Sequence, residues 1–134
     1  MAVKNTVSIR QATKGKLPRL PFVALKEAVL GKNYELSIAF VAAEESRRLN
    51  KIYRGKNKPA NILSFPLGKK EGEIIITLSE VKKDAKKFGY SFATFLPLIF
   101  VHGLFHLKGL RHGSTMERKE SALLKRFGLS ALIK

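Results

Sequence analysis

The sequence predicts one domain of the α+β class. Segments with apolar residues at helical spacing alternate with short runs rich in β-branched residues, and the run Phe95–Leu107 is almost wholly apolar, as in a buried central helix. A chain of 134 residues has the length of a single domain, and no internal repeat, linker or low-complexity tract divides it. We therefore expect a single domain over residues 1–134, with a β-sheet packed by helices.

The N-terminal half is predicted to hold two strands and two helices. They are a short strand around Val3, Val7 and Ile9, a helix over Phe22–Leu30, a strand over Glu35–Val41 and a helix over Ala43–Tyr53. The helices follow from apolar residues at helical spacing, and Gly31 and Gly55 end them. The strands follow from the alternation of polar and apolar residues, and the first leads into a basic loop around Lys14 and Lys16.

The middle of the chain predicts a pair of strands and a helix. Asn61–Pro66 and Gly72–Thr77 are short β-rich runs, which we expect to pair. Ser79 is the expected N-cap of the following helix, which ends at Gly89. The buried stripe of that helix is expected to be Val81, Ala85 and Phe88, with Lys82, Lys83, Lys86 and Lys87 facing outward.

A buried central helix and a final amphipathic helix complete the predicted domain. Thr94 is the expected cap of the central helix, and Pro97 is acceptable because it falls in the first turn. Gly109 ends this helix. The last helix is expected over Met116–Phe127, with Leu123, Leu124 and Phe127 facing inward.

Charge and composition limit the function. Lys and Arg number 26 against 10 Asp and Glu, and the resulting net charge of +16 attracts polyanions, nucleic acid first among them. The absence of cysteine excludes a disulfide scaffold, a thiolate metal site and a cysteine nucleophile. No apolar run approaches the length of a spanning helix, and the N-terminus lacks a signal-peptide segment, so we expect a cytoplasmic protein with no membrane partner.

All three histidines of the chain lie close together in the sequence. His102 and His106 are one helical turn apart on the same face of the central helix, so both imidazoles can bind one ion. Gly109 lets the backbone turn back after the helix, which would bring His112 to the same ion as a third ligand. The pattern predicts a three-histidine metal site on and just after the buried central helix.

The expected ion is a transition metal. Three neutral nitrogens suit zinc, nickel or copper, and three protein ligands leave a fourth position for water, as in catalytic zinc sites. Such an ion lowers the pKa of water towards about 7 and polarises a phosphoryl or carbonyl oxygen, which permits hydrolysis at neutral pH. We expect one Zn²⁺ ion, with other divalent transition metals as alternatives.

A metallopeptidase is the least favoured interpretation of this helix. The pattern resembles the metalloprotease helix H-E-x-x-H, but Gly103 stands where the glutamate that acts as general base would be. The nearest acids, Glu117 and Glu120, fall on the last predicted helix, where the solubility of that helix explains them.

The segment His102–His112 reads HGLFHLKGLRH and is similar to the H-G-x-L-H-L-x-G-x-D-H signature of the YbeY family of endoribonucleases and ribosomal RNA maturation factors. Three upstream segments are similar to that family's L-N-x-x-Y-R-G-K, T-D-V-L-S-F-P and G-D-I-x-I blocks, in the same order. They are Leu49–Lys56, Asn61–Pro66 and Gly72–Ile76. Together the segments span roughly the last two thirds of the chain, which argues against coincidence.

The resemblance implies a single α+β domain with a small mixed β-sheet and activity on RNA in ribosome maturation and quality control. It also implies a metal ion, usually described as zinc, held by His102, His106 and His112. Arg54 matches the arginine of the Y-R-G-K block, which is considered important for activity, and a guanidinium is a suitable clamp for a phosphate near the ion. Arg54 is therefore the candidate catalytic residue.

The chain departs from the family pattern at several positions. Arg111 stands where the pattern has an aspartate. If that carboxylate orients a ligand imidazole, its loss would weaken metal binding by about 10- to 100-fold, whereas a solvent-facing Arg111 would add a contact to phosphate. Asn61 and Glu73 replace two other aspartates and keep a polar group, and Phe105 replaces a leucine. No general acid or base is identified.

Two functions of different classes follow. The leading hypothesis is a metal-dependent endoribonuclease that cuts single-stranded ribosomal RNA, with either water or the RNA's own 2′-hydroxyl as nucleophile. The alternative is a ribosome-associated RNA-binding factor with a structural or weakened metal site. The small ribosomal subunit is a candidate partner, and the oligomeric state is left open. The residues expected to contact RNA are Lys51, Arg54, Lys56, Lys58 and Arg111.

Overall fold

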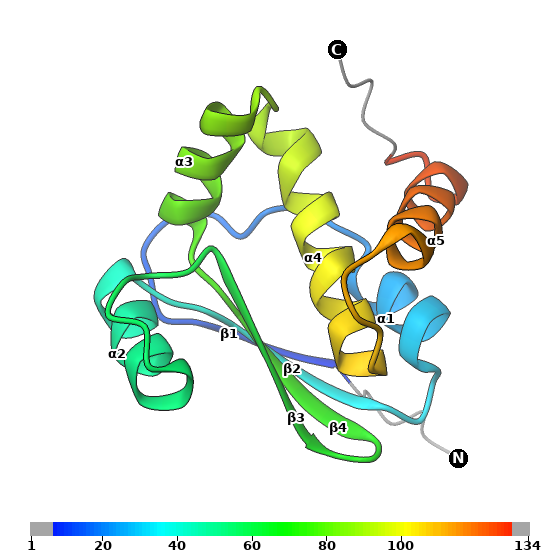
Figure 1. The fold of residues 1–134 in the computed structure, drawn as a ribbon, viewed down its shortest axis with the longest axis horizontal. Coiled ribbons are helices and arrows are strands. Elements are labelled where there is room, and N and C mark those ends of the chain that lie inside the picture. The colour runs from blue at the N-terminus through cyan, green and yellow to red at the C-terminus, as the bar shows by residue number, and fades with distance from the viewer. Residues whose placement is uncertain (1–6, 130–134) are drawn as a thin grey trace.

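In the computed structural model of the protein, residues 7–129 are described (Figure 1). Two strand–helix units are followed by a pair of strands and then by three consecutive helices, a segregation that is typical of the α+β class. In chain order they are β1 (Val7–Gln11), α1 (Phe22–Leu30), β2 (Glu35–Phe40), α2 (Ala43–Arg54), β3 (Ile62–Gly68), β4 (Glu71–Ile76), α3 (Leu78–Phe88), α4 (Phe92–Lys108) and α5 (Ser114–Arg126).

The four strands form one mixed sheet in the order β1-β2-β4-β3. β1, β2 and β4 are parallel, whereas β3 pairs antiparallel with β4 and forms one edge of the sheet. The edge position tolerates Pro66, which cannot donate a hydrogen bond to a neighbouring strand, and the pairing register shifts between Pro66 and Gly68. The small mixed sheet that the motif resemblance implies is confirmed.

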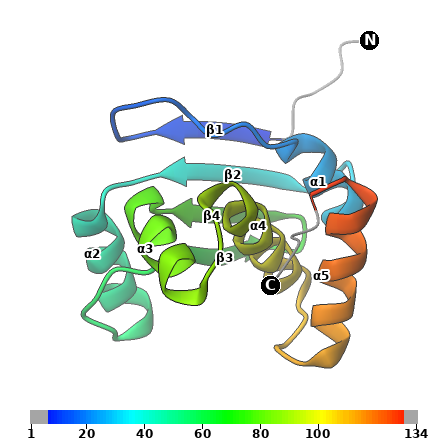
Figure 2. The same cartoon turned by 90° about the horizontal axis from the view of Figure 1, so that it is seen from above.

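Helices cover both faces of the sheet, and β4 shows how the faces divide. Ile74 and Ile76 belong to the large core that α1, α3, α4 and α5 close, whereas Ile75 points to the opposite face and joins a smaller cluster with Leu63 and Leu49 of α2. Figure 1 shows α4 crossing the sheet between α3 and α5, and Figure 2 shows α4 over the β3–β4 side. The C-terminal half of α4 therefore lies near the β3 edge of the sheet.

Helix α4 is the buried central helix that the sequence predicts, and Phe100 at its middle has no exposed surface. The prediction of its start is wrong. Ser91, in extended backbone, is the N-cap, and its Oγ accepts the N–H of Thr94 at 3.2 Å. The helix thus begins three residues earlier than expected, so Pro97 lies in the second turn instead of the first.

Two predictions for helix α3 are also wrong. The N-cap position is Thr77, whose side chain makes no capping hydrogen bond, and Ser79 lies inside the helix. Phe88 is 61% exposed, because it ends the helix at the turn into α4, where its ring meets Phe95 at a centroid distance of 6.3 Å. Val81 and Ala85 are buried and the four lysines of α3 are exposed, as predicted.

The remaining elements agree with the sequence to within one or two residues. α1 has the predicted bounds, β3 and β4 pair as expected, and α5 begins two residues before Met116. The part of the first strand expected around Val3 lies outside the described residues. Within residues 7–129 no single helix is long and apolar enough to cross a membrane, although α3 and α4, bent by 110°, meet that criterion as a pair by length and composition.

Candidate functional site

The three histidines meet where α4 ends. His102 and His106 project from successive turns of α4, and Gly109 ends the helix in the left-handed conformation, with φ of 99°. The chain then turns so that His112 lies against the other two, and the three ring centroids are 4.5 to 4.7 Å apart. The structure thus brings together all three side chains that the sequence selects as metal ligands.

The geometry fits one divalent transition-metal ion. Nε2 of His102 and Nε2 of His106 are 3.0 Å apart, and one nitrogen from each of the three rings lies within 4.8 Å of the others. Ligands at the Zn–N distance of a tetrahedral site are separated by about 3.3 Å, so small ring movements would enclose an ion. Three imidazoles without a carboxylate or thiolate are a donor set suited to zinc, nickel or copper.

The site favours the neutral form of the His106 imidazole. Burial lowers the pKa of His106 below its ordinary value, and the charges of His102, His112 and Arg54 lower it further. An imidazole must be unprotonated to bind a metal, so the lowered pKa keeps His106 available as a ligand.

Glu120 contacts this cluster, a role that was not predicted from the sequence. Its Oε2 lies 2.5 Å from Nδ1 of His102, and only 6% of the residue is exposed. The assignment of Glu120 to the soluble face of the last helix is therefore wrong. A signal was present, because Glu120 has helical spacing with the buried residues Met116, Leu123 and Leu124 and so falls on the inward face of α5.

Arg111 takes no part in these contacts among the histidines and Glu120. It lies on the turn between α4 and α5, directly before His112, and its side chain is open to solvent. Of the two alternatives for this departure, the structure supports the solvent-facing one, in which the guanidinium can meet a phosphate.

The position of Gly103 explains why a metalloprotease mechanism does not fit. Gly103 faces the sheet, where its carbonyl accepts a hydrogen bond from Ser64 Oγ at 3.2 Å. A Cβ atom on residue 103 would lie 2.8 Å from Cδ1 of Ile62 and 3.0 Å from Ser64 Oγ. A glutamate here would meet β3 before it could serve as general base, so the close approach of α4 to the sheet requires glycine.

We predict that Gly103→Ala destabilises the protein by about 1–3 kcal/mol, because the added methyl group overpacks the contact between α4 and β3. The measurement is urea-induced unfolding of the metal-free protein. Gly68→Ala is the matched control, since its Cβ would meet Glu71 Cβ at an ordinary 3.9 Å. Equal stability of the two variants would contradict the tight packing at Gly103.

Arg54 is the last residue of α2, and its charge acts on the histidine cluster. The helix ends at Gly55, whose left-handed backbone, with φ of 69°, turns the chain sharply after Arg54. The charge of Arg54 is one cause of the lowered pKa of His106, after burial and the other two histidines. A guanidinium that acts on this cluster is suited to the phosphate of a substrate held at the histidines.

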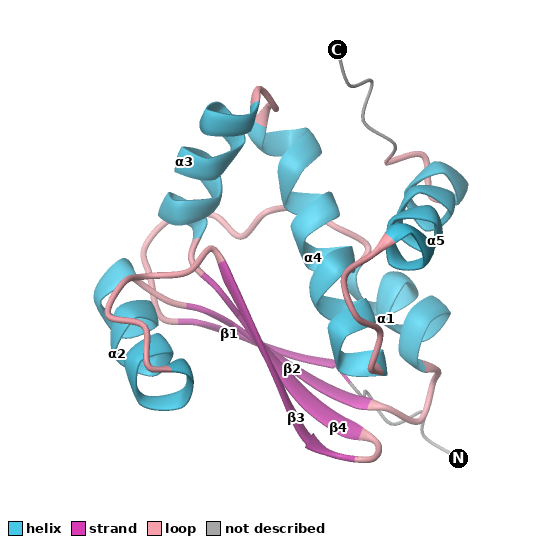
Figure 3. Cartoon of the chain, viewed as in Figure 1, coloured by secondary structure: helices cyan, strands magenta, loops and turns pink. Residues whose placement is uncertain are grey.

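A basic hollow of about 350 Å³ extends from Arg54 along the segment between α2 and β3. Figure 3 shows that this segment is a loop. Lys56 and Lys58 line it together with Arg54, so three of the predicted RNA contacts converge. Asn50 of α2 donates its Nδ2–H to Lys58 O at 2.8 Å, which holds this loop against the helix. Lys51 lies elsewhere, in a neighbouring hollow over the exposed face of α2.

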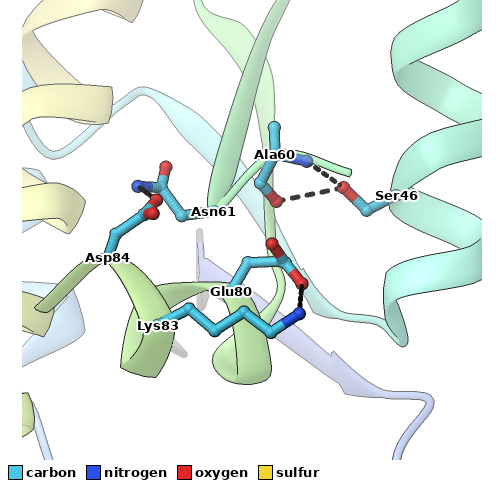
Figure 4. Close-up of polar contacts among 6 residues, drawn as sticks. All are labelled: Ser46, Ala60, Asn61, Glu80, Lys83 and Asp84. Carbon is cyan, nitrogen blue, oxygen red and sulfur yellow. Dashed lines mark hydrogen bonds and ion pairs between the residues drawn. The ribbon is translucent and has the colours of Figure 1, made fainter. Parts of the chain in front are cut away.

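The same loop is fixed at its far end (Figure 4). Ser46 Oγ donates to Ala60 O at 3.0 Å and accepts from Ala60 N–H at 2.9 Å. Asn61 Nδ2 donates to Asp84 Oδ2 of α3 at 2.8 Å. An aspartate at position 61 would place two carboxylates face to face, so asparagine suits this chain, and the loop presents its lysines from a defined backbone.

Comparison with known proteins agrees with these observations. The family model for Endoribonuclease YbeY matches residues 3–129. The chain is 36% identical over 116 residues to Endoribonuclease YbeY of Geobacillus kaustophilus, covering 72% of this chain and 74% of that protein. It is 33% identical over 142 aligned positions to Endoribonuclease YbeY of Aquifex aeolicus, covering 98% of this chain and 94% of that protein.

The fold is similar to a solved structure as well. The solution structure of TM1509 from Thermotoga maritima matches with a TM-score of 0.60 and 25% sequence identity, over 91% of this chain and 89% of that one. The family model and the relatives confirm the resemblance that the sequence motifs indicate. The chain therefore belongs to the YbeY endoribonuclease family.

Proposed function

We propose that this domain is a zinc-dependent endoribonuclease of the cytoplasm that cleaves single-stranded ribosomal RNA. The observation that carries the proposal is the convergence of His102, His106 and His112 at one point. The charge of Arg54 acts on His106 of this cluster. Membership of the family supports RNA as the substrate. The net charge of +16 supports a polyanionic substrate, whatever its nucleotide sequence.

The residues have separate tasks in this proposal. The three histidines would hold Zn²⁺, which when bound supplies a Lewis acid for a phosphoryl oxygen and lowers the pKa of water. Arg54 would hold the scissile phosphate and offset the negative charge that develops on its oxygens. Lys56 and Lys58 would bind neighbouring phosphates along the hollow, and the exposed Arg111, directly before His112, would contact a further phosphate of the RNA.

The two carboxylates near the hollow are each held by a partner. Glu80 and Asp84 line its wall on α3. Asp84 accepts a hydrogen bond from Asn61, and Glu80 pairs with Lys83 at 3.4 Å, as Figure 4 shows. These partners reduce the repulsion that the two carboxylates would exert on a phosphate.

The alternative of an RNA-binding factor with a weakened metal site depends on Arg111 having removed a carboxylate from the site. A carboxylate is present from another element, because Glu120 is hydrogen-bonded to His102. We therefore favour the enzyme.

Metal removal tests the proposal directly. The full-length protein is stripped with a chelator, checked by elemental analysis and assayed on a single-stranded ribosomal RNA fragment before and after addition of one equivalent of Zn²⁺. We expect cleavage to disappear with the metal and to return with zinc. Mn²⁺, Ni²⁺ and Cu²⁺ in parallel identify the ion that supports the highest rate.

The RNA ends separate the two chemical routes, since attack by the 2′-hydroxyl leaves a cyclic phosphate and attack by water does not. Cleavage that persists in protein shown to be metal-free would contradict the metal-dependent mechanism. Salt-sensitive RNA binding without cleavage by the zinc-loaded protein would favour the binding factor.

A further inference from the structure

We infer that Glu120 is a positioning residue that fixes the ring of His102 for metal binding; the inference rests on the proposed metal site. A histidine ligand has two ring nitrogens, and the partner of one decides which nitrogen is free to bind the ion. In this chain the segment His102–His112 itself contains no carboxylate, and Arg111 stands where the family pattern has an aspartate. The structure supplies one from α5.

The contact selects one tautomer of His102. Nδ1 lies 2.5 Å from Glu120 Oε2, so a carboxylate accepts the Nδ1–H. The proton on Nδ1 leaves the lone pair on Nε2, and Nε2 is the atom that lies 3.0 Å from Nε2 of His106. The nitrogen that faces the other ligands is therefore the one that the hydrogen bond keeps unprotonated.

The burial of Glu120 argues against a solubilising role. Its side chain is 9% exposed, on the helix face that carries Met116, Leu123 and Leu124 into the core. An apolar residue would pack there without the desolvation cost of a carboxylate, and His102 is the partner that offsets this cost in the described structure. The glutamate therefore fits a role at the histidines better than a role in packing.

The supporting helix also makes the position rigid. Met116 is 1% and Leu124 is 5% exposed, so the carboxylate is held between two anchors of α5 packed against the core around α4. His112 and Arg111, in contrast, lie on the exposed turn between the two helices. Glu120 thus ties the ligand on α4 to a second helix that does not itself bind the ion.

The test compares Glu120→Leu, which keeps a similar volume, with Glu120→Gln, whose amide oxygen can still accept the Nδ1–H. The zinc dissociation constant is measured by competition with a chromophoric chelator, in the absence of RNA. We expect it to rise about 10- to 100-fold in Glu120→Leu and by a smaller factor in Glu120→Gln. Glu117→Gln, a change at an exposed position of the same helix, is the control and should leave the zinc dissociation constant unchanged.

A second readout follows the tautomer without metal. The ¹⁵N chemical shifts of the His102 ring in the metal-free protein should show a proton on Nδ1 in wild type and Glu120→Gln, and a mixture of tautomers in Glu120→Leu. If Glu120 had a structural role alone, Glu120→Leu would change the unfolding temperature but neither the zinc dissociation constant nor the tautomer of His102.

The outcomes distinguish this inference from the proposed function. Unchanged zinc affinity and an unchanged tautomer in Glu120→Leu would overturn the positioning role while the metal site stands. Failure of the wild type to bind zinc would overturn both. Loss of RNA cleavage on chelation together with unchanged zinc affinity in Glu120→Leu would uphold the enzyme and overturn the role of Glu120.

Discussion

His106→Ala is expected to release the metal and to lower RNA cleavage by about a thousandfold or more. His106 lies within reach of both other ligands, with ring centroids 4.5 Å from His102 and 4.7 Å from His112. Its removal leaves two ligands, of which His112 is on an exposed turn. A catalytic metal contributes several kcal/mol of charge stabilisation in the transition state, and each 1.36 kcal/mol changes the rate tenfold.

Elemental analysis and cleavage are measured on the same preparation of untagged protein. Wild type should hold about one transition-metal ion per chain, and His106→Ala should hold almost none. Lys108→Ala, two residues further along α4, is the control for a change in this helix, because its Nζ donates to Val29 O of α1 at 2.9 Å. Stoichiometric metal in folded His106→Ala would show that the ion binds elsewhere.

The helices and the ligand set are predictable from the sequence because their signals are local. Apolar spacing determines α1, and the spacing of His102 and His106, with Gly109 shortly after them, is enough to indicate the cluster. The strand pair follows in the same way from two β-rich runs close in the chain. These signals need no knowledge of which elements pack together.

The errors arise where a contact between distant elements decides the outcome. Glu120 looks like one charge among many on α5, and only the packing of α5 against α4 places it at His102. Phe88 has the right spacing for burial, but it is the last residue of α3, at the turn into α4, and is 61% exposed. The separation of Lys51 from Lys56 and Lys58 depends likewise on the fold of the loop after α2.

Arg54→Gln is expected to lower the rate of cleavage by about 100- to 1,000-fold while the metal content stays that of wild type. Removal of one preorganised donor to a developing negative charge has an effect of this size. Arg54 lies at the C-terminus of α2 and does not belong to the three-histidine cluster, so the ion should remain. Arg54→Lys keeps the charge and should retain part of the activity, since a lysine cannot hold a phosphate in the bidentate manner.

A change in the pKa of His106 distinguishes a local role of Arg54 from a general loss of charge. The cation of Arg54 is one cause of the lowered pKa, after burial and the other histidines. In metal-free Arg54→Gln the pKa of His106 should therefore rise, so the ring takes up its proton at a higher pH than in wild type. Arg47→Gln removes the same charge from an exposed site on α2 and should leave both this pKa and the rate close to wild type. Equal losses of activity in Arg47→Gln and Arg54→Gln would mean that Arg54 acts through the overall field of the protein and does not hold the scissile phosphate.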